Sequence, residues 1–144
     1  MKIRHKIVPS SYLVLIKNGK TLLARRKNTG YEDGNYGLVA GHGEIGETFT
    51  DTLIREVFEE ANIKLDPKKL RVAHIMHRKG RSDERVDVFF IARRWKGVPK
   101  IMEPEKCDHM EWFDLKDLPA NTIDYIKMAL KNIEKGIFYS EFGW

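Results

Sequence analysis

The stretch that decides the fold runs Gly41-His42-Gly43-Glu44-Ile45-Gly46-Glu47, then seven residues to Ile54, then Arg55-Glu56-Val57-Phe58-Glu59-Glu60-Ala61-Asn62-Ile63. Its second half has the spacing of an amphipathic helix, which we predict over residues 48–62. Apolar side chains four residues apart lie on one face of a helix. The chain has such a stripe at Phe49, Leu53, Val57 and Ala61. Thr48 is the predicted N-cap, with Asp51 in the position of a capping box.

Three carboxylates lie beside this apolar stripe. Glu56 and Glu60 are four residues apart and Glu59 is adjacent, so all three share one face of the predicted helix. Carboxylates that converge repel one another unless a cation lies among them. Hard oxygen ligands favour Mg²⁺ or Mn²⁺, which bind a few carboxylates together with substrate phosphates. The alternative is a solvated acidic face, which is the common arrangement for isolated glutamates.

The loop ahead of the helix favours the metal site over the solvated face. Gly41, Gly43 and Gly46 predict a tight turn and a close approach of backbone to ligand. A turn that leads into a helix N-terminus presents N–H donors suited to phosphate. We therefore expect Gly41 and Gly43 to contact a phosphorylated substrate.

These residues resemble the Nudix box, in which a glycine, a glutamate, an Arg-Glu pair and a Glu-Glu pair recur at set spacings. The matching residues are Gly41, Glu47, Arg55, Glu56, Val57, Glu59, Glu60 and Ile63. Asn62 departs from the pattern, which has glycine at the helix C-terminus. That position requires a left-handed backbone, and Asn is the next best residue there. We expect the departure to leave catalysis unaffected.

The resemblance implies an α/β (α+β) fold, a Nudix-type α/β/α sandwich with a mixed central sheet. It implies divalent-metal-dependent hydrolysis of a nucleoside diphosphate-X phosphoanhydride. The implied catalytic residues are Glu59, Glu60, Arg55 and Glu47, and the implied ligands of Mg²⁺ or Mn²⁺ are Glu56, Glu59, Glu60, Glu44 and the carbonyl of Ala40. Arg55 would orient the glutamates through a bidentate bond. Our choice of base is Glu59, with Glu60 or a later carboxylate, Glu103 or Glu105, as rivals.

The substrate is left open among three hypotheses. The segment Glu103–Cys107, followed by Trp112, looks like a segment of the triphosphate-cleaving members and favours a nucleoside triphosphate split into monophosphate and pyrophosphate. The second hypothesis is a dinucleoside polyphosphate, ADP-ribose or a nucleotide sugar, although Arg78–Arg81 lacks the proline or tyrosine typical of two of these groups. The third is a non-catalytic nucleotide-binding module. Besides Gly41 and Gly43, the expected substrate contacts are Arg26, Glu103 and Trp112.

The rest of the chain predicts mixed strands and a second helix. Strands are expected at 7–16, 21–24, 36–39, 70–77, 85–95 and 109–113, with a polar loop at 78–84. The second helix is expected at 121–135, with Ile123, Ile126, Leu130 and Ile133 on one stripe. His74 and His77 lie three apart on a predicted strand, so they should point to opposite faces. The apolar tail at 137–144 is expected to fold back on the domain or to join a homodimer interface.

The bulk composition limits the partners. A chain of 144 residues suits one domain, 1–144, and its net charge of +5 suits an anionic substrate. The basic residues are dispersed and no groove-reading motif is present, so no stable nucleic-acid complex is expected. No apolar run reaches the roughly 20 residues that span a bilayer. A single cysteine, Cys107, excludes an internal disulfide and is expected to be inert, and the cytoplasm is the expected location.

Overall fold

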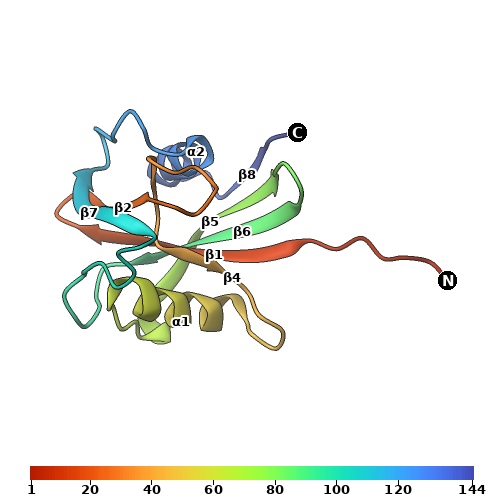
Figure 1. Cartoon of the computed structure of the whole chain (residues 1–144), viewed down its shortest axis with the longest axis horizontal. Helices are drawn as coiled ribbons and strands as arrows, with labels where there is room; N and C mark the ends of the chain where they lie inside the picture. The colour runs from red at the N-terminus through yellow and green to blue at the C-terminus, as the bar shows by residue number, and fades with distance from the viewer.

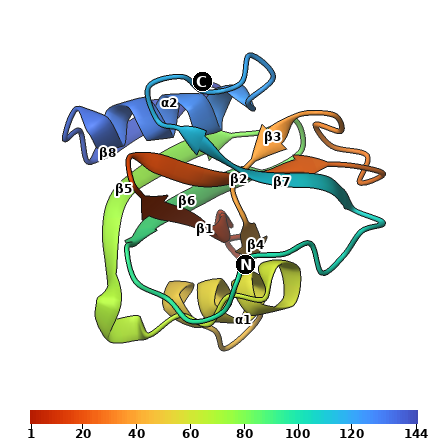
Figure 2. The same ribbon diagram turned by 90° about the vertical axis from the view of Figure 1, so that its left-hand side faces the viewer.

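The computed structural model describes residues 1–144 as a mixed sheet with one α-helix on each face (Figures 1 and 2). The elements are β1 (Val8–Lys17), β2 (Lys20–Arg26), β3 (Tyr36–Gly37), β4 (Ala40–His42), α1 (Phe49–Ala61), a 3₁₀ turn (Pro67–Lys69), β5 (Leu70–Lys79), β6 (Glu84–Ala92), β7 (Cys107–Asp114), α2 (Asp124–Glu134) and β8 (Tyr139–Phe142). The predicted α/β/α sandwich is confirmed. Neither helix combines the length and the apolar character that a membrane crossing requires.

The strand β1 lies at the centre of the sheet, whose order is β3-β2-β1-β6-β5-β8. It pairs in parallel with β6 along most of its length, while β4 pairs with its first half and β2 with its last residues. β7 pairs antiparallel with β2, and β8 lies parallel to β5. The two parallel pairs among antiparallel ones make the sheet mixed, as expected.

Both faces of the central strands are buried. Successive side chains of a strand point to opposite faces, and in β1 Tyr12 and Val14 pack toward α2 whereas Leu13 and Leu15 pack toward α1. Phe89 and Phe90 of β6 alternate in the same way. Burial on both faces explains why these strands read as continuous apolar runs instead of alternating ones.

Helix α1 has the ends that its sequence predicts. The Thr48 hydroxyl accepts from the Asp51 N–H, and the Asp51 carboxylate accepts from the Thr48 N–H, which completes the capping box. Leu53, Val57 and Ala61 are fully buried. Asn62 ends the helix at φ 61° and ψ 30°, the left-handed conformation expected for the position that departs from the Nudix pattern.

The segment before α1 differs from the prediction. The strand expected at 36–39 is the short β3, and residues 40–42, expected to be part of a glycine turn, form β4 opposite Ser10–Tyr12 of β1. Of the three glycines in this stretch, only Gly46 has a positive φ, at 87°. The long-range pairing with β1 supplies the hydrogen bonds of β4, and no local pattern reports such a partner.

Two further element boundaries differ between the sequence prediction and the structure, also because of specific hydrogen-bond and ion-pair partners. β5 continues through Arg78, predicted in the loop 78–84, because Arg78 finds a buried partner in Asp87 of β6. Helix α2 begins at Asp124 instead of residue 121 because the Asn121 carbonyl accepts from the Tyr36 N–H and the Thr122 N–H donates to the Pro119 carbonyl.

The apolar tail folds back on the sheet, one of the two outcomes expected for it. His74 of β5 is fully buried and donates through Nδ1 to the Ile137 carbonyl at 2.8 Å, while its Nε2 accepts from Ser140 Oγ at 2.7 Å. Trp144 Nε1 donates to the His77 carbonyl at 3.2 Å. His77 contacts the Trp144 ring and Glu84, away from the buried side of His74, so the opposite facing of the two histidines is confirmed.

Candidate active site

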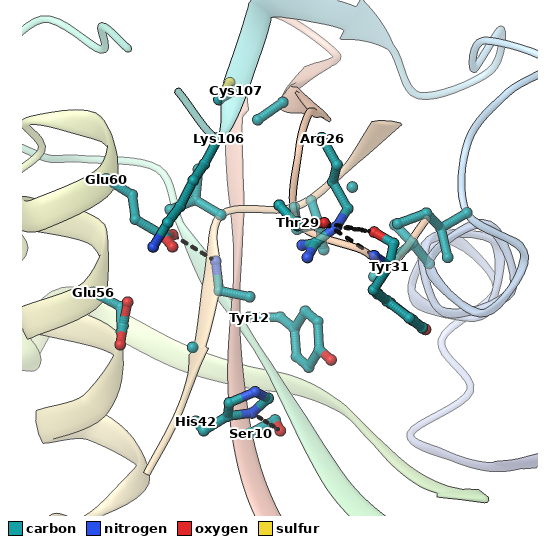
Figure 3. Close-up of a pocket in the computed structure, with 18 of the residues that line it drawn as sticks. Ser10, Tyr12, Arg26, Thr29, Tyr31, His42, Glu56, Glu60, Lys106 and Cys107 are labelled. Carbon is teal, nitrogen blue, oxygen red and sulfur yellow. Dashed lines mark hydrogen bonds between the residues drawn. The ribbon is translucent and has the colours of Figure 1, made fainter. Parts of the chain in front are cut away.

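A cavity of about 720 Å³ opens beside β1 and β4 and reaches from α1 to α2 (Figure 3). Glu56 and Glu60 line it from α1 and Gly41 lines it from β4. The loop after β2, the segment 103–107, the β5–β6 turn and α2 supply most of the remaining walls. A volume of this size suits a small-molecule ligand, since such pockets occupy about 300–1,000 Å³.

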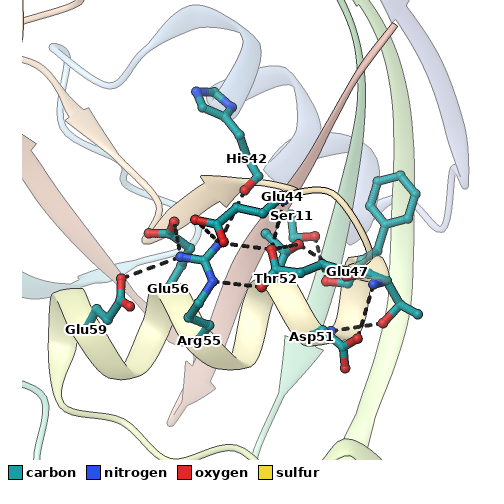
Figure 4. Close-up of polar contacts among 11 residues, drawn as sticks. Ser11, His42, Glu44, Glu47, Asp51, Thr52, Arg55, Glu56 and Glu59 are labelled. Atoms are coloured by element: carbon teal, nitrogen blue, oxygen red, sulfur yellow. Dashed lines mark hydrogen bonds and ion pairs between the residues drawn. The ribbon is translucent and has the colours of Figure 1, made fainter.

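Arg55 holds the acidic residues around α1 in place (Figure 4). Its Nε and Nη2 donate to the two Glu47 oxygens at 2.7 and 3.0 Å, the bidentate geometry that the sequence predicted. Its Nη1 donates to Glu56 at 2.8 Å and lies 3.5 Å from Glu59. These hydrogen bonds lower the pKa of Glu47 to about 2, so Glu47 is ionised throughout the physiological range. The bidentate bond fixes the direction in which Arg55 presents Nη1 to Glu56.

Glu60 is the most perturbed carboxyl group of the site. Burial, together with the negative charge of Glu56, raises its pKa to about 8, against a weaker opposing effect of the Ala40 N–H, which donates to Glu60 at 3.4 Å. Burial also raises the pKa of Glu56, although Arg55 opposes the shift. Two carboxyl groups therefore share one end of the cavity, and of the two only Glu56 has an ion pair, with Arg55.

Gly41 is required where it stands because Glu56 occupies the space of a side chain. A Cβ on Gly41 would overlap the Glu56 side chain at Cγ and Cδ. The absence of a side chain lets β4 approach α1 closely, so the Glu56 carboxylate reaches the cavity. The role of Gly41 here is close approach and not the tight turn that the glycine pattern suggested.

The donor set fits a divalent cation. No group of three or more His, Cys, Asp and Glu side chains is already drawn together as a metal site. Glu56 and Glu60 nevertheless bring hard oxygen donors to one end of the cavity, where a cation would offset the burial and the neighbouring negative charges that raise their pKa values. The Ala40 N–H donates to Glu60 and not to β1. Hydrogen-bonded pairs alternate along an antiparallel ladder, and the bonds to β1 on either side of Ala40 include those of the Val39 carbonyl and the Gly43 N–H.

The structure gathers some predicted site residues at the cavity and leaves others outside. Arg26 and Glu103 line it with Glu56, Glu60, Ala40 and Gly41. The residues outside its lining are Glu44, Glu47, Arg55, Glu59, Gly43 and Trp112. The Glu59 side chain is 53% exposed and faces Arg55. Trp112 packs with the α1-side core and stacks on Trp95, with ring centroids 5.7 Å apart, so it is not brought to the cavity.

Several cavity residues carried no signal in the sequence. Tyr12, Arg85, Lys106 and Tyr125 come from four different parts of the chain and meet only in the fold. His42 lines the cavity and its Nδ1 accepts from Arg85 Nη1 at 2.8 Å, while burial and the Arg85 charge lower its pKa. Cys107 also lines the cavity, but burial raises its thiol pKa, which agrees with the inert role expected for it.

Comparison with known proteins agrees with the Nudix resemblance. Residues 8–131 match the family model described as NUDIX domain. The ADP-ribose pyrophosphatase of Methanocaldococcus jannaschii is 29% identical over 115 residues, which are 80% of this chain and 66% of that protein. The NAD-capped RNA hydrolase NudC of Pseudomonas putida is 27% identical over 114 residues, 79% of this chain. The match spans only 39% of that NudC protein's length.

A solved structure shows the same fold. The MutT NUDIX hydrolase from Burkholderia pseudomallei superposes with a TM-score of 0.81 at 24% identity, covering 88% of this chain and 98% of the other. The family match covers most of the chain and includes every residue of the box, from Gly41 to Ile63. Nudix hydrolases generally use divalent metals, which agrees with the carboxylates gathered at the cavity. The chain therefore belongs to the Nudix family.

Proposed function

We propose that the cavity binds a nucleoside diphosphate linked to a further group, and that the chain hydrolyses the phosphoanhydride and releases a nucleoside monophosphate. The observation that carries the proposal is that one cavity is lined both by the carboxylates Glu56 and Glu60 and by cationic side chains. Arg26 lies close enough to Glu60 to lower its pKa, and Lys106 lines the same space. Carboxylates that bind a cation, next to basic groups that bind phosphate, suit an anhydride substrate.

The metal of the proposal is Mg²⁺ or Mn²⁺. Glu56 and Glu60 would hold it, with Glu59, Glu44 and the Ala40 carbonyl as the further ligands that the family resemblance implies. When bound, the cation supplies positive charge that stabilises the negative charge developing on the phosphate oxygens.

The other proposed roles are the positioning of the carboxylates, the binding of the phosphates and the deprotonation of water. Arg55 is a positioning residue, since it holds Glu47 and Glu56 without lining the cavity. Arg26 and Lys106 bind the phosphates. For the base that deprotonates the attacking water, Glu60 and Glu103 line the cavity whereas Glu59 does not, which favours one of the first two over Glu59.

Two substrates are to be compared. A nucleoside triphosphate, split into monophosphate and pyrophosphate, is supported by the likeness of Glu103–Cys107 to the triphosphate-cleaving members. ADP-ribose is the second substrate, supported by the relative from Methanocaldococcus jannaschii.

The test is hydrolysis of both substrates in ¹⁸O-labelled water, with and without Mg²⁺, followed by mass analysis of the products. We expect metal-dependent release of a nucleoside monophosphate, with pyrophosphate as the second product from a triphosphate. Glu56→Gln should lose turnover, and Glu134→Gln, an exposed change on α2, is the matched control. Orthophosphate as the first product excludes pyrophosphate release, and brisk turnover of ADP-ribose alone assigns the second substrate. No metal-dependent turnover of any nucleotide refutes the proposal.

A further inference from the structure

The cavity contains a charged side chain that the proposed reaction does not use. Arg78 of β5 lines the cavity with Tyr12 and Tyr125, yet only 6% of its side chain is exposed. Its Nε and Nη2 donate to the two oxygens of Asp87, at 2.6 and 3.4 Å, and Asp87 is fully buried. The bidentate pair fixes the orientation of the guanidinium plane.

One nitrogen of this guanidinium has no partner in the chain. Nη2 also donates to the Tyr12 hydroxyl at 3.1 Å, but Nη1, with its two N–H groups, donates to nothing. Only one side-chain polar atom, Thr21 Oγ1, is fully buried without a hydrogen-bond partner. Arg78 Nη1 has no partner and is not such an atom, so it keeps some exposed surface. The cavity is the space that Arg78 lines. A fixed pair of donors therefore faces the cavity.

The surroundings of Nη1 suit an uncharged planar group. The Arg78 Cζ lies 3.8 Å from the centroid of the Tyr125 ring, and the Tyr12 and Tyr125 hydroxyls lie 3.1 Å apart. Ile126 of α2 also lines the cavity. Asp87 already compensates the Arg78 charge, and Asp83 compensates the neighbouring Arg85 at 2.8 Å. An anion would gain little there, whereas aromatic walls with N–H donors suit a flat ring that carries an acceptor.

In the proposed function, the phosphates lie at the end of the cavity beside Glu56 and Glu60. Arg26 donates to the Tyr31 carbonyl and has no carboxylate partner, and it lies near Glu60. In Figure 3 the labelled Glu56 and Glu60 reach in from α1, and Tyr12 projects from β1 on the other side of the β4 ribbon. A nucleotide whose phosphates lie by Glu56 and Glu60 directs its base toward Arg78.

We propose that Arg78 is a specificity-determining residue whose Nη1 donates to a ring carbonyl of the base, so that the enzyme prefers oxo bases over amino bases. Guanidinium nitrogens can donate hydrogen bonds but cannot accept them. A purine with a 6-oxo group, or a pyrimidine with a 4-oxo group, presents an acceptor, whereas a 6-amino or 4-amino group at the same place presents a donor. This inference rests on the proposed function in one respect, namely that a nucleotide enters this cavity.

The test compares ligands that differ at the exocyclic group and the ring nitrogen beside it. Inosine and adenosine monophosphates differ in the 6-oxo and 6-amino groups and in the proton that inosine carries on N1, and uridine and cytidine monophosphates differ in the same way at position 4 and at N3. Calorimetric titration of the wild-type protein should show tighter binding of inosine over adenosine monophosphate and of uridine over cytidine monophosphate, by about tenfold in each pair. Equal affinities within both pairs, a preference for the amino bases, or no saturable binding overturns the inference.

Variants assign the preference to Arg78. Arg78→Met combined with Asp87→Asn removes both charges, because losing Arg78 alone would leave Asp87 buried and unpaired. This double variant should bind the two members of each pair equally. The matched control, Arg85→Met with Asp83→Asn, removes another compensated pair at the cavity and should keep the preference. Should the Arg78 variant fail to fold, the guanidinium N–H signals of Arg78 in wild-type protein must shift with inosine monophosphate and not with adenosine monophosphate, or the assignment fails.

Monophosphates are not hydrolysed, so binding and turnover report separately. An oxo-base preference in binding without turnover of any triphosphate keeps this inference and refutes the proposed substrate. Turnover of triphosphates without any preference among bases refutes this inference and keeps the proposed function.

Discussion

At the scale of single residues, Glu60 combines a desolvated carboxyl group with a proposed metal-binding role that needs charge. Its folded pKa of about 8 lies above the ordinary value of 4.5, so the folded protein retains a proton that the unfolded chain loses between these two pH values. The folded state binds more protons in that window, and its stability therefore falls as the pH rises from about 4.5 to 8. A bound cation reverses this cost by favouring the ionised form.

Glu60→Gln separates the two effects. In metal-free buffer at pH 8, the variant should be more stable than the wild type by on the order of 1–3 kcal/mol, because Gln carries no charge to desolvate. Its turnover should fall by about 100-fold or more, since even partners outside the ligand shell of a metal cost about 10–100-fold. Denaturant unfolding at pH 5 and pH 8, with steady-state assays, measures both.

Divalent cations supply the control for this prediction. Mg²⁺ should raise the melting temperature of the wild type and leave that of Glu60→Gln nearly unchanged. Near-full activity of the variant at saturating Mg²⁺ would remove Glu60 from the metal site.

At the scale of elements, the close contact between β4 and α1 positions the Glu56 carboxylate at the cavity. Gly41→Ala places a Cβ against the Glu56 side chain. Because a side chain moves more easily than a strand, we expect Glu56 to be displaced, with at least about a tenfold loss of kcat/KM and a folded protein. Thermal unfolding and kinetics test this together.

A double-variant comparison identifies the cause. In a Glu56→Ala background the Cβ of Gly41→Ala has no side chain to displace, so it should cost little further activity. Full additivity of the two losses would show that Gly41 acts through something other than Glu56.

The end of α1 offers a second test at this scale. Asn62 has a left-handed backbone, and its side chain makes only a long bond, 3.5 Å, to the Val98 carbonyl. Asn62→Gly should therefore leave activity unchanged and alter the free energy of unfolding by no more than about 0.5 kcal/mol. Asn62→Val, with a β-branched side chain, should destabilise by about 1–2 kcal/mol. A loss above about 2 kcal/mol in Asn62→Gly would reveal an unrecognised role of the amide.

At the scale of the whole molecule, the last strand closes the edge of the sheet. β8 follows α2 and lies parallel to β5, and His74 of β5 bonds Ser140 inside this contact. The chain end thus returns to a strand that begins about half a chain earlier. Such pairing depends on the complete fold and on no local pattern.

Ser140→Ala measures the contribution of this closure. It leaves the buried His74 Nε2 without its donor, so we expect a loss of about 1–3 kcal/mol in unfolding free energy with kcat/KM unchanged. Tyr139→Phe, an exposed change on the same strand, should cost less than about 0.5 kcal/mol. Equal effects of the two changes would show that the His74 contact contributes nothing.

Local sequence patterns were enough to predict helix α1 and, together with the family resemblance, the fold class. The stripe of Leu53, Val57 and Ala61, the Thr48 capping box and the left-handed Asn62 all depend on residues within four positions of one another. The family resemblance indicated a bidentate bond from Arg55 to the glutamates, and the structure gives Glu47 as its partner. The same resemblance indicated the family and its mixed sandwich. The predicted roles of the glutamates, of Arg26 and of Trp112 remain predictions for experiment.

The tertiary structure alone decided what shares the cavity. β4 exists because β1 pairs with it, and Arg78 joins a strand because Asp87 neutralises it from the next one. Tyr12 and Tyr125 are 113 residues apart and meet where α2 packs on the sheet. Hydrogen bonds and charge pairs between residues so far apart produce no periodic pattern in the sequence, so they cannot be predicted from it. The buried face and the ends of a helix depend on residues a few positions apart, so they can be predicted.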